Sequence, residues 1–507
     1  MISYRKLAMR VLGHSPVSAA KTARRRSTAK RAAALALTAA LVVGMTLPAF
    51  AQDWFIENGD IEISAGESGN KVVQNGEEKA ANDTDTVIKS NYPSTASSNS
   101  VTIEAGAGKT VNVTLDNVNI DTSGTWKAAV SVIGSGDTNI ELNGNNTLTS
   151  GDGHAGLEHN KKTDSEGKET SGTLTIQDEK NDDGSAKGSA SDTTGSLTAN
   201  GGFKGAGIGG SNEKDGQVTI TGGEITANGG YKGAGIGGGY SSNGTVTITD
   251  GDINANGGYK GAGIGGGDKG NGTVEITGGD ITANGGDSGA GIGGGNKKDG
   301  QVTITGGEIT ATGGLWGTGI GGGAGGLGNV SIEGNVTIKN AQGGAGAAGI
   351  GGGAESEPDA AGNGNKISIK STAAGSPNIT ATGGRAYENR WVSLPGAAAI
   401  GSGSVDESHG QVNAKSDITI EGKVTIDATG GGDVAIGDND GEKVFNGLAG
   451  GTNIKRTDSN GKDVTQDGDV VAEPEPKPEP EEPEKPAQPT VTPTEGAEAP
   501  STGSVEV

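Results

Sequence analysis

Four consecutive segments of 28 residues, between residues 201 and 312, are near copies of one another. Each begins with Gly-Gly-x-x-Gly-Ala-Gly-Ile-Gly-Gly, and the isoleucine of this run recurs, with one more copy downstream, at Ile208, Ile236, Ile264, Ile292 and Ile320. A fixed period of this length is typical of a solenoid, in which each repeat is one coil that packs only on its neighbours. The hydrophobic content of 31% would by itself indicate disorder, so the fold is predicted from the periodicity.

Each repeat contains three short runs in which apolar and polar residues alternate. In the first copy these runs are 205–209, 217–221 and 224–227. Alternation with period two is typical of strands, and the runs are too short and too rich in glycine for helices. The sequence therefore predicts an all-β fold, a parallel β-helix (β-solenoid) with three short strands per coil, stacked at ~4.8 Å. In the Gly-rich run, Ala206 and Ile208 are expected to face the core. The glycines are interpreted either as an outward face of bare backbone or as a requirement of steric crowding at a corner.

The repeat weakens in both directions, which sets the expected domain boundaries. We expect an N-terminal cap region at 52–100, the parallel β-helix at 101–450 and a polar linker at 451–472. The distance from Leu157 to the next equivalent residue, Ile208, leaves room for an insertion. That insertion is assigned to one of two polar stretches, at 161–171 or 182–194.

Residues 1–51 have the pattern of a signal peptide. They contain nine basic residues and no acidic ones, an apolar run of about sixteen residues that is short for a membrane span, and a small-x-small motif that ends at Ala51. We expect cleavage between Ala51 and Gln52, after ordinary secretion or twin-arginine export. The protein is accordingly predicted to be secreted or bound to a bacterial cell surface, with no membrane span in the mature chain.

Residues 473–507 begin with Glu-Pro repeats and have no apolar periodicity. Such a segment is predicted to be a disordered, extended spacer because its charges repel and its prolines are stiff. It resembles the wall-spanning stalks of Gram-positive surface proteins. Residues 499–503 also resemble a sortase motif, with alanine where that motif has leucine.

Charge and cysteine content restrict the function. The net charge of −23 becomes −32 once the nine positive charges of 1–51 are removed, so nucleic acid is not an expected partner. The chain has no cysteine, which excludes disulfides, thiolate catalysis and cysteine-bound zinc.

A row of aromatic and basic residues gives the strongest binding prediction. Stacking the coils places equivalent residues above one another, so that single exposed positions become rows. One row contains an aromatic residue followed by lysine in three successive copies: Phe203 and Lys204, Tyr231 and Lys232, Tyr259 and Lys260. We interpret it either as a platform for sugar rings, with lysine donating to hydroxyl or acidic groups, or as a ladder that only covers a turn.

Two weaker patterns involve carboxylates and histidines. The acidic row consists of Glu224, Asp252, Asp280 and Glu308, whose repulsion is relieved either by Ca²⁺ or by salt screening. His154 and Glu158 share one face of a predicted strand, and His159 follows. These three residues are interpreted either as a metal site or as a solvated surface. No other cofactor is expected.

A third candidate lies where the downstream repeats become longer. Tyr387, Arg390 and Trp391 belong to a loop that extends from an enlarged coil, and we expect this loop either to grip a ligand or to cover the side of the stack.

The Gly-Ala-Gly-Ile-Gly-Gly-Gly repeats, over about 100–450, resemble the pectate-lyase-like superfamily of right-handed parallel β-helices found in bacterial secreted proteins. This resemblance implies either enzymes that cleave acidic polysaccharides or non-catalytic carbohydrate-binding proteins. The lyases use a Ca²⁺-binding acidic cluster with a basic residue, and the hydrolases use several close aspartates. Neither arrangement is found here, since Asp182-Asp183 and Gly153-His154 match only in part.

We therefore expect a secreted or cell-surface protein, not an enzyme, that binds an extracellular polysaccharide or a host or cell-wall surface. Two alternatives stay open: a structural adhesin or stalk with no small ligand, and a polysaccharide lyase or hydrolase.

Overall fold

The structure is a computed structural model, which describes residues 52–178, 195–390, 392–406, 411–438, 441–445 and 447–472. The predicted signal peptide with Ala51, and the predicted spacer 473–507, lie outside the described residues. Gln52 is the first residue described. Within these ranges no helix has both the length and the apolar character needed to cross a membrane.

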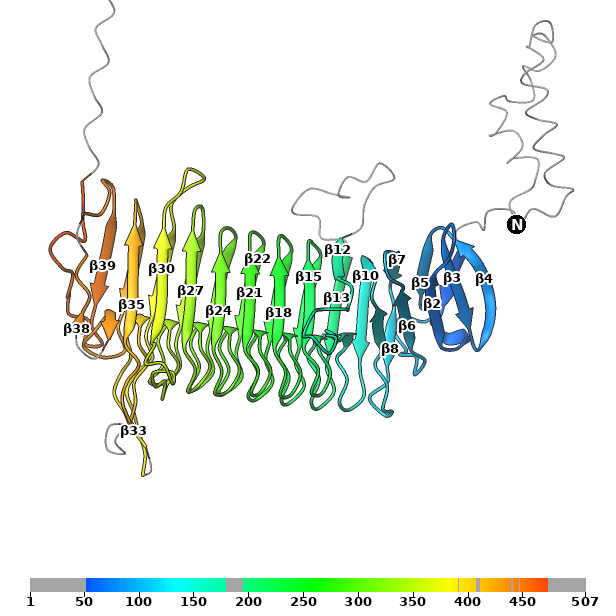
Figure 1. The fold of residues 1–507 in the computed structure, drawn as a ribbon, viewed down its shortest axis with the longest axis horizontal. Helices are drawn as coiled ribbons and strands as arrows, with labels where there is room; N and C mark the ends of the chain where they lie inside the picture. The colour runs from blue at the N-terminus through cyan, green and yellow to red at the C-terminus, as the bar shows by residue number, and fades with distance from the viewer. Residues whose placement is uncertain are drawn as a thin grey trace, which may run out of the picture.

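The described chain forms one elongated parallel β-helix that runs from the N-terminal end, blue in Figure 1, to the C-terminal end, red. Its strands form a 22-stranded sheet and a 15-stranded sheet, and successive coils pair in parallel along the whole length. The predicted fold class is confirmed.

Each regular coil contributes one strand to each of three faces. The first face contains β1 (Gln52–Phe55), β5 (Thr86–Lys89), β7 (Thr110–Asp116), the start of β10 (Asp137–Thr149), β12 (Leu174–Asp178), β15 (Gly216–Ile220), β18 (Gly244–Ile248), β21 (Gly272–Ile276), β24 (Gly300–Ile304), β27 (Gly328–Glu333), β30 (Asn365–Lys370) and β35 (Ser416–Glu421). The second face contains β8 (Asn119–Asp121), the end of β10, β13 (Gly195–Asn200), β16 (Glu224–Asn228), β19 (Asp252–Asn256), β22 (Asp280–Asn284), β25 (Glu308–Thr312), β28 (Thr337–Gln342), β31 (Asn378–Thr382), β36 (Thr425–Thr429) and β39 (Asn453–Thr457).

The third face consists mostly of two-residue strands. It contains β2 (Ile61–Ala65), β6 (Val101–Ala105), β9 (Val130–Gly134), β11 (Leu157–His159), β14 (Ile208–Gly209), β17 (Ile236–Gly237), β20 (Ile264–Gly265), β23 (Ile292–Gly293), β26 (Ile320–Gly321), β29 (Ile350–Gly351), β34 (Ile400–Gly401) and β37 (Ile436–Asp438).

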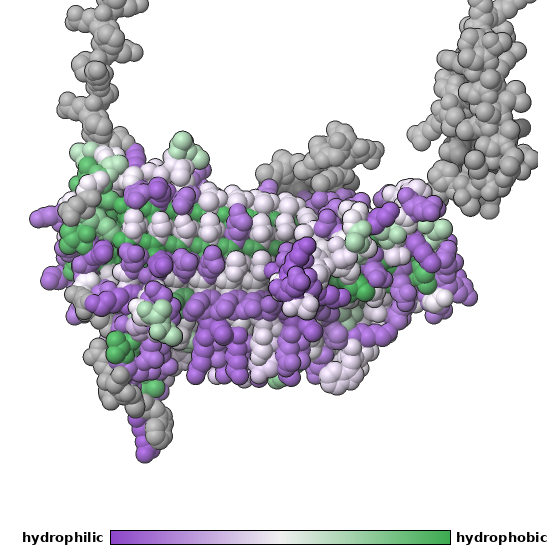
Figure 2. Space-filling model, in the orientation of Figure 1, coloured by the Kyte–Doolittle hydropathy of each residue, from purple (hydrophilic) through white to green (hydrophobic). Residues whose placement is uncertain are grey.

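The core is a set of aliphatic columns inside the coils. Val218 and Ile220 of the first face, Ile225 and Ala227 of the second and Ile208 of the third are all buried, as are their copies in later coils. Because each residue meets its own copy, the columns are uniform, and residues of similar hydropathy form rows along the long axis of the molecule (Figure 2). The prediction of which residues face the core is therefore confirmed for all three strands of the repeat.

The asparagines that end the second-face strands form a hydrogen-bonded ladder along the rod. The side-chain amide of Asn228 donates to Asn200 at 2.9 Å, Asn256 donates to Asn228 at 3.0 Å, and Asn284 donates to Asn256 at 2.9 Å. This ladder satisfies polar groups that would otherwise be half-buried without a partner.

Of the two interpretations of the glycines in the Gly-rich run, the exposed backbone face is wrong and the steric crowding is confirmed. Gly205, Gly207 and Gly209 are buried, because the turns on either side of the two-residue strand fold over it. The Ala206 amide donates to the Gly210 carbonyl at 3.0 Å, which closes this segment into a small loop. The turns themselves are joined, since the amide of Tyr240 donates to the carbonyl of Lys204 at 2.8 Å.

We call the turns from the second face to the third face the aromatic corner. It consists of residues 201–206 and the equivalent turns of the neighbouring coils. Their glycines are required by contact between coils. A Cβ atom on Gly230 would lie 1.7 Å from the carbonyl oxygen of Gly202, and one on Gly258 would lie 1.8 Å from that of Gly230. A side chain there would force successive coils apart.

The N-terminal boundary differs from the expected one. The strand β1 pairs in parallel with β5, and β2 pairs in parallel with β6, so residues 52–100 already contribute to the β-helix. The cap is the antiparallel pair β3 (Asn70–Gln74) and β4 (Glu77–Asp83), preceded by the short 3₁₀ turn η1 (Ile56–Asn58). Trp54 closes this end of the core and donates to the carboxylate of Asp83 at 2.6 Å.

The C-terminal boundary differs as well, because 451–472 is not a linker. The strand β39 pairs in parallel with β36, and Arg456 stands where the preceding coil has the inward-facing Ala428. This arginine is fully buried, with its Nη1 atom 2.7 Å from Glu442 and its Nη2 atom 2.8 Å from Asp469. The aliphatic column therefore ends in a charged plug, with β38 (Gly441–Glu442) beside it.

The coil contact predicts a position-specific effect of alanine. Gly258→Ala should lower the free energy of unfolding by about 1–3 kcal/mol, because the new Cβ overlaps a backbone oxygen that cannot move independently. Gly106→Ala is the matched control, since a Cβ there meets nothing within 4 Å. Urea unfolding of the whole protein measures both, and equal stability of the two variants would contradict the close-contact explanation.

The plug predicts a second effect. Arg456→Met should destabilise the C-terminal coils by about 3–5 kcal/mol, because it leaves the carboxylate of Asp469 buried without its partner. Lys455→Met changes the neighbouring exposed residue and should be nearly neutral. Hydrogen exchange of the β36 and β39 amides reports this locally, and unchanged protection in Arg456→Met would show that the ion pair does not hold the end of the fold.

Candidate functional site

The three aromatic residues of the predicted row are stacked on the aromatic corner. The ring centroids of Phe203 and Tyr231 are 5.3 Å apart with planes within 6°, and those of Tyr231 and Tyr259 are 5.1 Å apart with planes within 8°. Their side chains remain 48%, 48% and 43% exposed, in that order. The prediction that these residues form an exposed ladder is confirmed.

The stacking changes what the ladder presents to a ligand. Parallel rings at these distances face one another, so Tyr231 has a neighbouring ring on both sides. A sugar cannot lie flat on such a ring, and the expected platform of aromatic faces is therefore wrong for the middle of the row. What remains accessible is ring edges, which carry positive partial charge, and the phenol hydroxyls of Tyr231 and Tyr259.

The lysines of the row turn toward a fourth ring. Tyr240 lies on the polar corner, the turns from the third to the first face (211–215, 239–243 and their equivalents). Lys232 Nζ is 4.3 Å from the Tyr240 ring centroid, Lys204 Nζ is 5.4 Å from it, and Lys269 Nζ is 5.9 Å from it. These are cation–π distances. Lys260 follows Tyr259 in register, and its carbonyl accepts from Asn296.

The lysine cluster also affects the phenol of Tyr240. A hydrogen bond with the Ser241 side chain lowers the pKa of Tyr240, and the charges of Lys269 and Lys232 lower it further. The phenol is thus a better hydrogen-bond donor than an ordinary tyrosine, surrounded by three ammonium groups.

Tyr240 and Lys269 were not among the predicted site residues. Tyr240 is the only aromatic residue at its repeat position, where the other copies have Asn212, Asp268 and Asn296. A lone aromatic in a polar turn was visible in the sequence. Its position beside the lysines could not be predicted from the sequence. That position depends on the backbone hydrogen bonds that join the aromatic corner to the polar corner.

The acidic row is in register, as predicted. Glu224, Asp252, Asp280 and Glu308 begin consecutive second-face strands and are exposed. Lys339 lies 2.5 Å from Glu308 and 3.2 Å from Asp280, and these contacts raise the pKa of its ammonium group. Thr337 is the register partner of Glu308, and a shift two residues later leaves Lys339 as an extra residue of β28, whose side chain reaches the carboxylates of the row.

A cation for the acidic row stays a prediction, and Lys339 already supplies a positive charge at its C-terminal end. Across the ranges that the structure describes, no group of three or more histidine, cysteine, aspartate or glutamate residues is arranged to hold a metal ion.

The structure brings His154 and Glu158 together but directs His159 elsewhere, and of the three only His154 is partly exposed. The Nδ1 atom of His154 lies 2.7 Å from Glu158 Oε2, whereas Nδ1 of His159 lies 2.7 Å from the carbonyl oxygen of Gln217. Glu158 and His159 are both buried. The two histidines thus have separate partners, one a carboxylate and one a backbone carbonyl.

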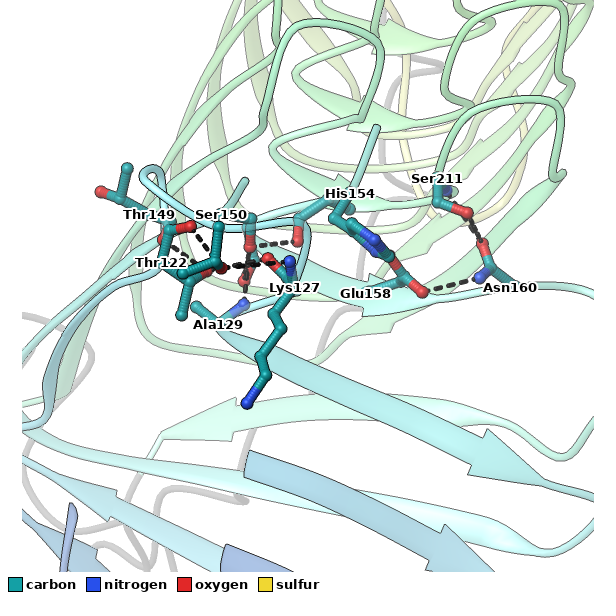
Figure 3. A network of polar contacts seen from close by, with 12 residues as sticks. Thr122, Lys127, Ala129, Thr149, Ser150, His154, Glu158, Asn160 and Ser211 are labelled. Atoms are coloured by element: carbon teal, nitrogen blue, oxygen red, sulfur yellow. Dashed lines mark hydrogen bonds and ion pairs between the residues drawn. The ribbon is translucent and has the colours of Figure 1, made fainter. Parts of the chain in front are cut away.

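The network around Glu158 connects irregular and regular coils (Figure 3). Asn160 donates to the second oxygen of Glu158 at 2.9 Å, and both the amide and the hydroxyl of Ser211 donate to Asn160. On the other side, Ser150 accepts from the amide of Ala129. We therefore interpret this network as a structural link between neighbouring coils. The Ser211 hydroxyl donates to Asn160 and is not directed at the His154 ring.

The predicted loop between Arg385 and Leu394 is a hairpin of β32 (Tyr387–Glu388) and β33 (Ser393–Leu394), which projects from the rod in Figure 1. Tyr387 contacts Trp316 edge to face at a centroid distance of 4.7 Å. Arg390 is exposed on the hairpin, and Trp391 lies outside the described residues. The hairpin borders a cavity of about 570 Å³.

These features define a class of protein, the parallel β-helix proteins. A family model described as a beta helix repeat matches residues 195–212, 218–240, 246–268, 274–296 and 302–324. The first three matched segments contain the aromatic row and Tyr240. Comparison with curated proteins and with solved structures gave no match.

The two histidines should titrate in opposite directions from the ordinary value of 6.5. The hydrogen bond to Glu158 raises the pKa of His154, and burial lowers the pKa of His159. NMR titration of the imidazole signals, assigned with His154→Gln and His159→Gln, measures both. Two unshifted curves would contradict the network.

The same shifts fix the signs of two stability effects. The bond of His154 stabilises the fold below pH 6.5, and this contribution is lost as the pH rises through the raised pKa. Neutral His159 contributes above pH 6.5, and its contribution is lost as the pH falls through the lowered pKa.

Proposed function

We propose that this β-helix protein binds an extended acidic polysaccharide, without catalysis, along the aromatic corner, and that it does so as a secreted or cell-surface protein. The observation that carries the proposal is the exposed stack of Phe203, Tyr231 and Tyr259 with lysines gathered at Tyr240 beside it. Positive ring edges, phenol hydroxyls and ammonium groups all favour anionic or hydroxyl-bearing ligands.

The arrangement is linear, which favours a polymer over a small molecule. The stacked rings repeat at 5.1–5.3 Å, close to the length of one sugar residue in an extended glycan. Each coil can therefore offer the same contacts to successive units, and weak contacts add up through multivalency.

The net charge of the chain makes the lysine cluster more selective. On a protein with a net charge of −23, most of the surface repels an acidic polymer, and a local group of lysines gives it one preferred place. The interaction should weaken with added salt, because exposed charges are screened over about 10 Å at 0.1 M ionic strength.

The structural alternative, a stalk without a ligand, is favoured by a different observation. The rod has a continuous core and is closed at both ends, by Trp54 with Asp83 and by Arg456 with Asp469. A closed rod is suited to projecting whatever it carries, so this role is compatible with polymer binding along one corner.

Binding to immobilised polygalacturonate and hyaluronate, with neutral dextran as reference, tests the proposal. The triple variant Phe203→Ala, Tyr231→Ala and Tyr259→Ala should bind the acidic polymers at least tenfold more weakly, a loss of about 1.4 kcal/mol. The variant Lys204→Gln, Lys232→Gln and Lys269→Gln should also lose much of the salt dependence.

The matched control changes three stacked residues of the first face, Thr245→Ala, Thr273→Ala and Gln301→Ala, and should bind like the parent protein. Unchanged affinity in the aromatic variant, or equal loss in the control, would contradict the proposal. Shortening of the polymer with appearance of unsaturated uronate absorbance would instead support the lyase alternative.

A further inference from the structure

The cavity beside the hairpin β32–β33 is built by an enlargement of the coil on both sides of the third face. The described residues that extend the aromatic corner of this coil are 385–390 and 392–396, and those that extend its polar corner are 402–406 and 411–414. The cavity of about 570 Å³ lies between the two extensions and is lined by Ala386, Tyr387, Glu388, Ser393, Leu394, Pro395, Val405 and Asp406.

The extensions are held in place by packing and hydrogen bonds. Leu394 packs with Ala347 and Ala354, and the Ser404 hydroxyl donates to the carbonyls of Gly346 at 3.1 Å and Pro395 at 2.7 Å. Gly346 has a positive φ of 66°, and a Cβ there would lie 2.7 Å from the Ser404 oxygen. The turn of the preceding coil is small, so the two extensions can lie over it.

The hairpin leans back along the aromatic corner. Tyr387 contacts Trp316, which belongs to a coil two positions earlier than its own. Trp316 in turn lies two coils beyond Tyr259, and the coil that carries the cavity lies four coils beyond it, roughly 19 Å at the usual coil spacing. A polymer that follows the row therefore reaches the cavity within a few units.

The lining differs in chemistry from the row. Glu388 and Asp406 provide carboxylate oxygens, and Asp406 is buried and accepts from the amide of Ser393 at 3.2 Å. Leu394, Pro395 and the Tyr387 ring provide apolar surface. Carboxylates accept hydrogen bonds from hydroxyl or ammonium groups and repel other carboxylates, whereas apolar walls fit the C–H face of a sugar ring.

We infer that this cavity is a second carbohydrate site, which takes a neutral or amino sugar unit and excludes a uronate. The inference rests on the proposed function in that the sugar unit belongs to the same polymer whose acidic part lies on the aromatic corner. It narrows the ligand class to acidic glycans that also contain, or end in, a neutral or amino sugar.

Saturation-transfer NMR with the whole protein tests the cavity without a polymer. The probes are glucosamine, glucose and glucuronate. Glucosamine and glucose should receive saturation, and glucuronate, which the lysines of the aromatic corner also attract, should not displace them. Ala386→Trp, which fills the cavity from its exposed wall, should remove the glucosamine signal, whereas Ala360→Trp, on an exposed loop outside the lining, should leave it unchanged.

A charge variant separates the role of the carboxylate from that of the cavity shape. Glu388→Gln should weaken glucosamine at least severalfold and affect glucose less, because only the amino sugar carries a positive charge. An undiminished signal in Ala386→Trp, displacement of glucosamine by glucuronate, or no saturation of either non-acidic sugar would overturn the inference. The two proposals can be told apart with the triple aromatic variant. This variant should lose binding of the acidic polymer but should still bind glucosamine in the cavity.

Discussion

The close approach of one turn to the next at the aromatic corner is the contact on which the rest of the structure depends. Gly230 and Gly258 sit where a Cβ would be within 2 Å of a carbonyl oxygen of the preceding coil. Since the regular coils between residues 201 and 312 meet the same restriction, they stack at one spacing and in one register. The aliphatic columns, the asparagine ladder and the ring stack all follow from that shared register.

Register also explains how ordinary exposed residues come to form one continuous surface. A single exposed aromatic residue next to a lysine is an ordinary surface feature, but one phenylalanine and two tyrosines at one repeat position become a continuous strip of ring edges with two hydroxyls. The direct hydrogen bonds between the two corners then place Tyr240 beside the lysines of the neighbouring turn. Where the repeat is interrupted, the same corner carries a hairpin and a cavity with a different lining.

Much of the fold was predictable because the repeat determines it. The inward residues such as Ile220 and Ile225, the parallel stacking and the alignment of Phe203 with Tyr231 follow from period and parity alone. The burial of Gly207 did not follow, because parity does not reveal turns that fold over a two-residue strand. The terminal coil was missed because Arg456 takes the place of an inward alanine, and a buried arginine is recognised only with its partners.

The candidate site was predictable in part for the same reason. The aromatic and lysine row could be recognised in the sequence. The directions of its rings and lysines could not, because they depend on distances within a coil that the repeat pattern does not determine. A lysine-labelling footprint, read by mass spectrometry with and without a long acidic oligosaccharide, tests the central claim most directly. Protection of Lys204, Lys232 and Lys269, with Lys79 and Lys455 labelled as before, is the result predicted here. Uniform labelling, or protection confined to lysines away from Tyr240, would contradict binding along the aromatic corner.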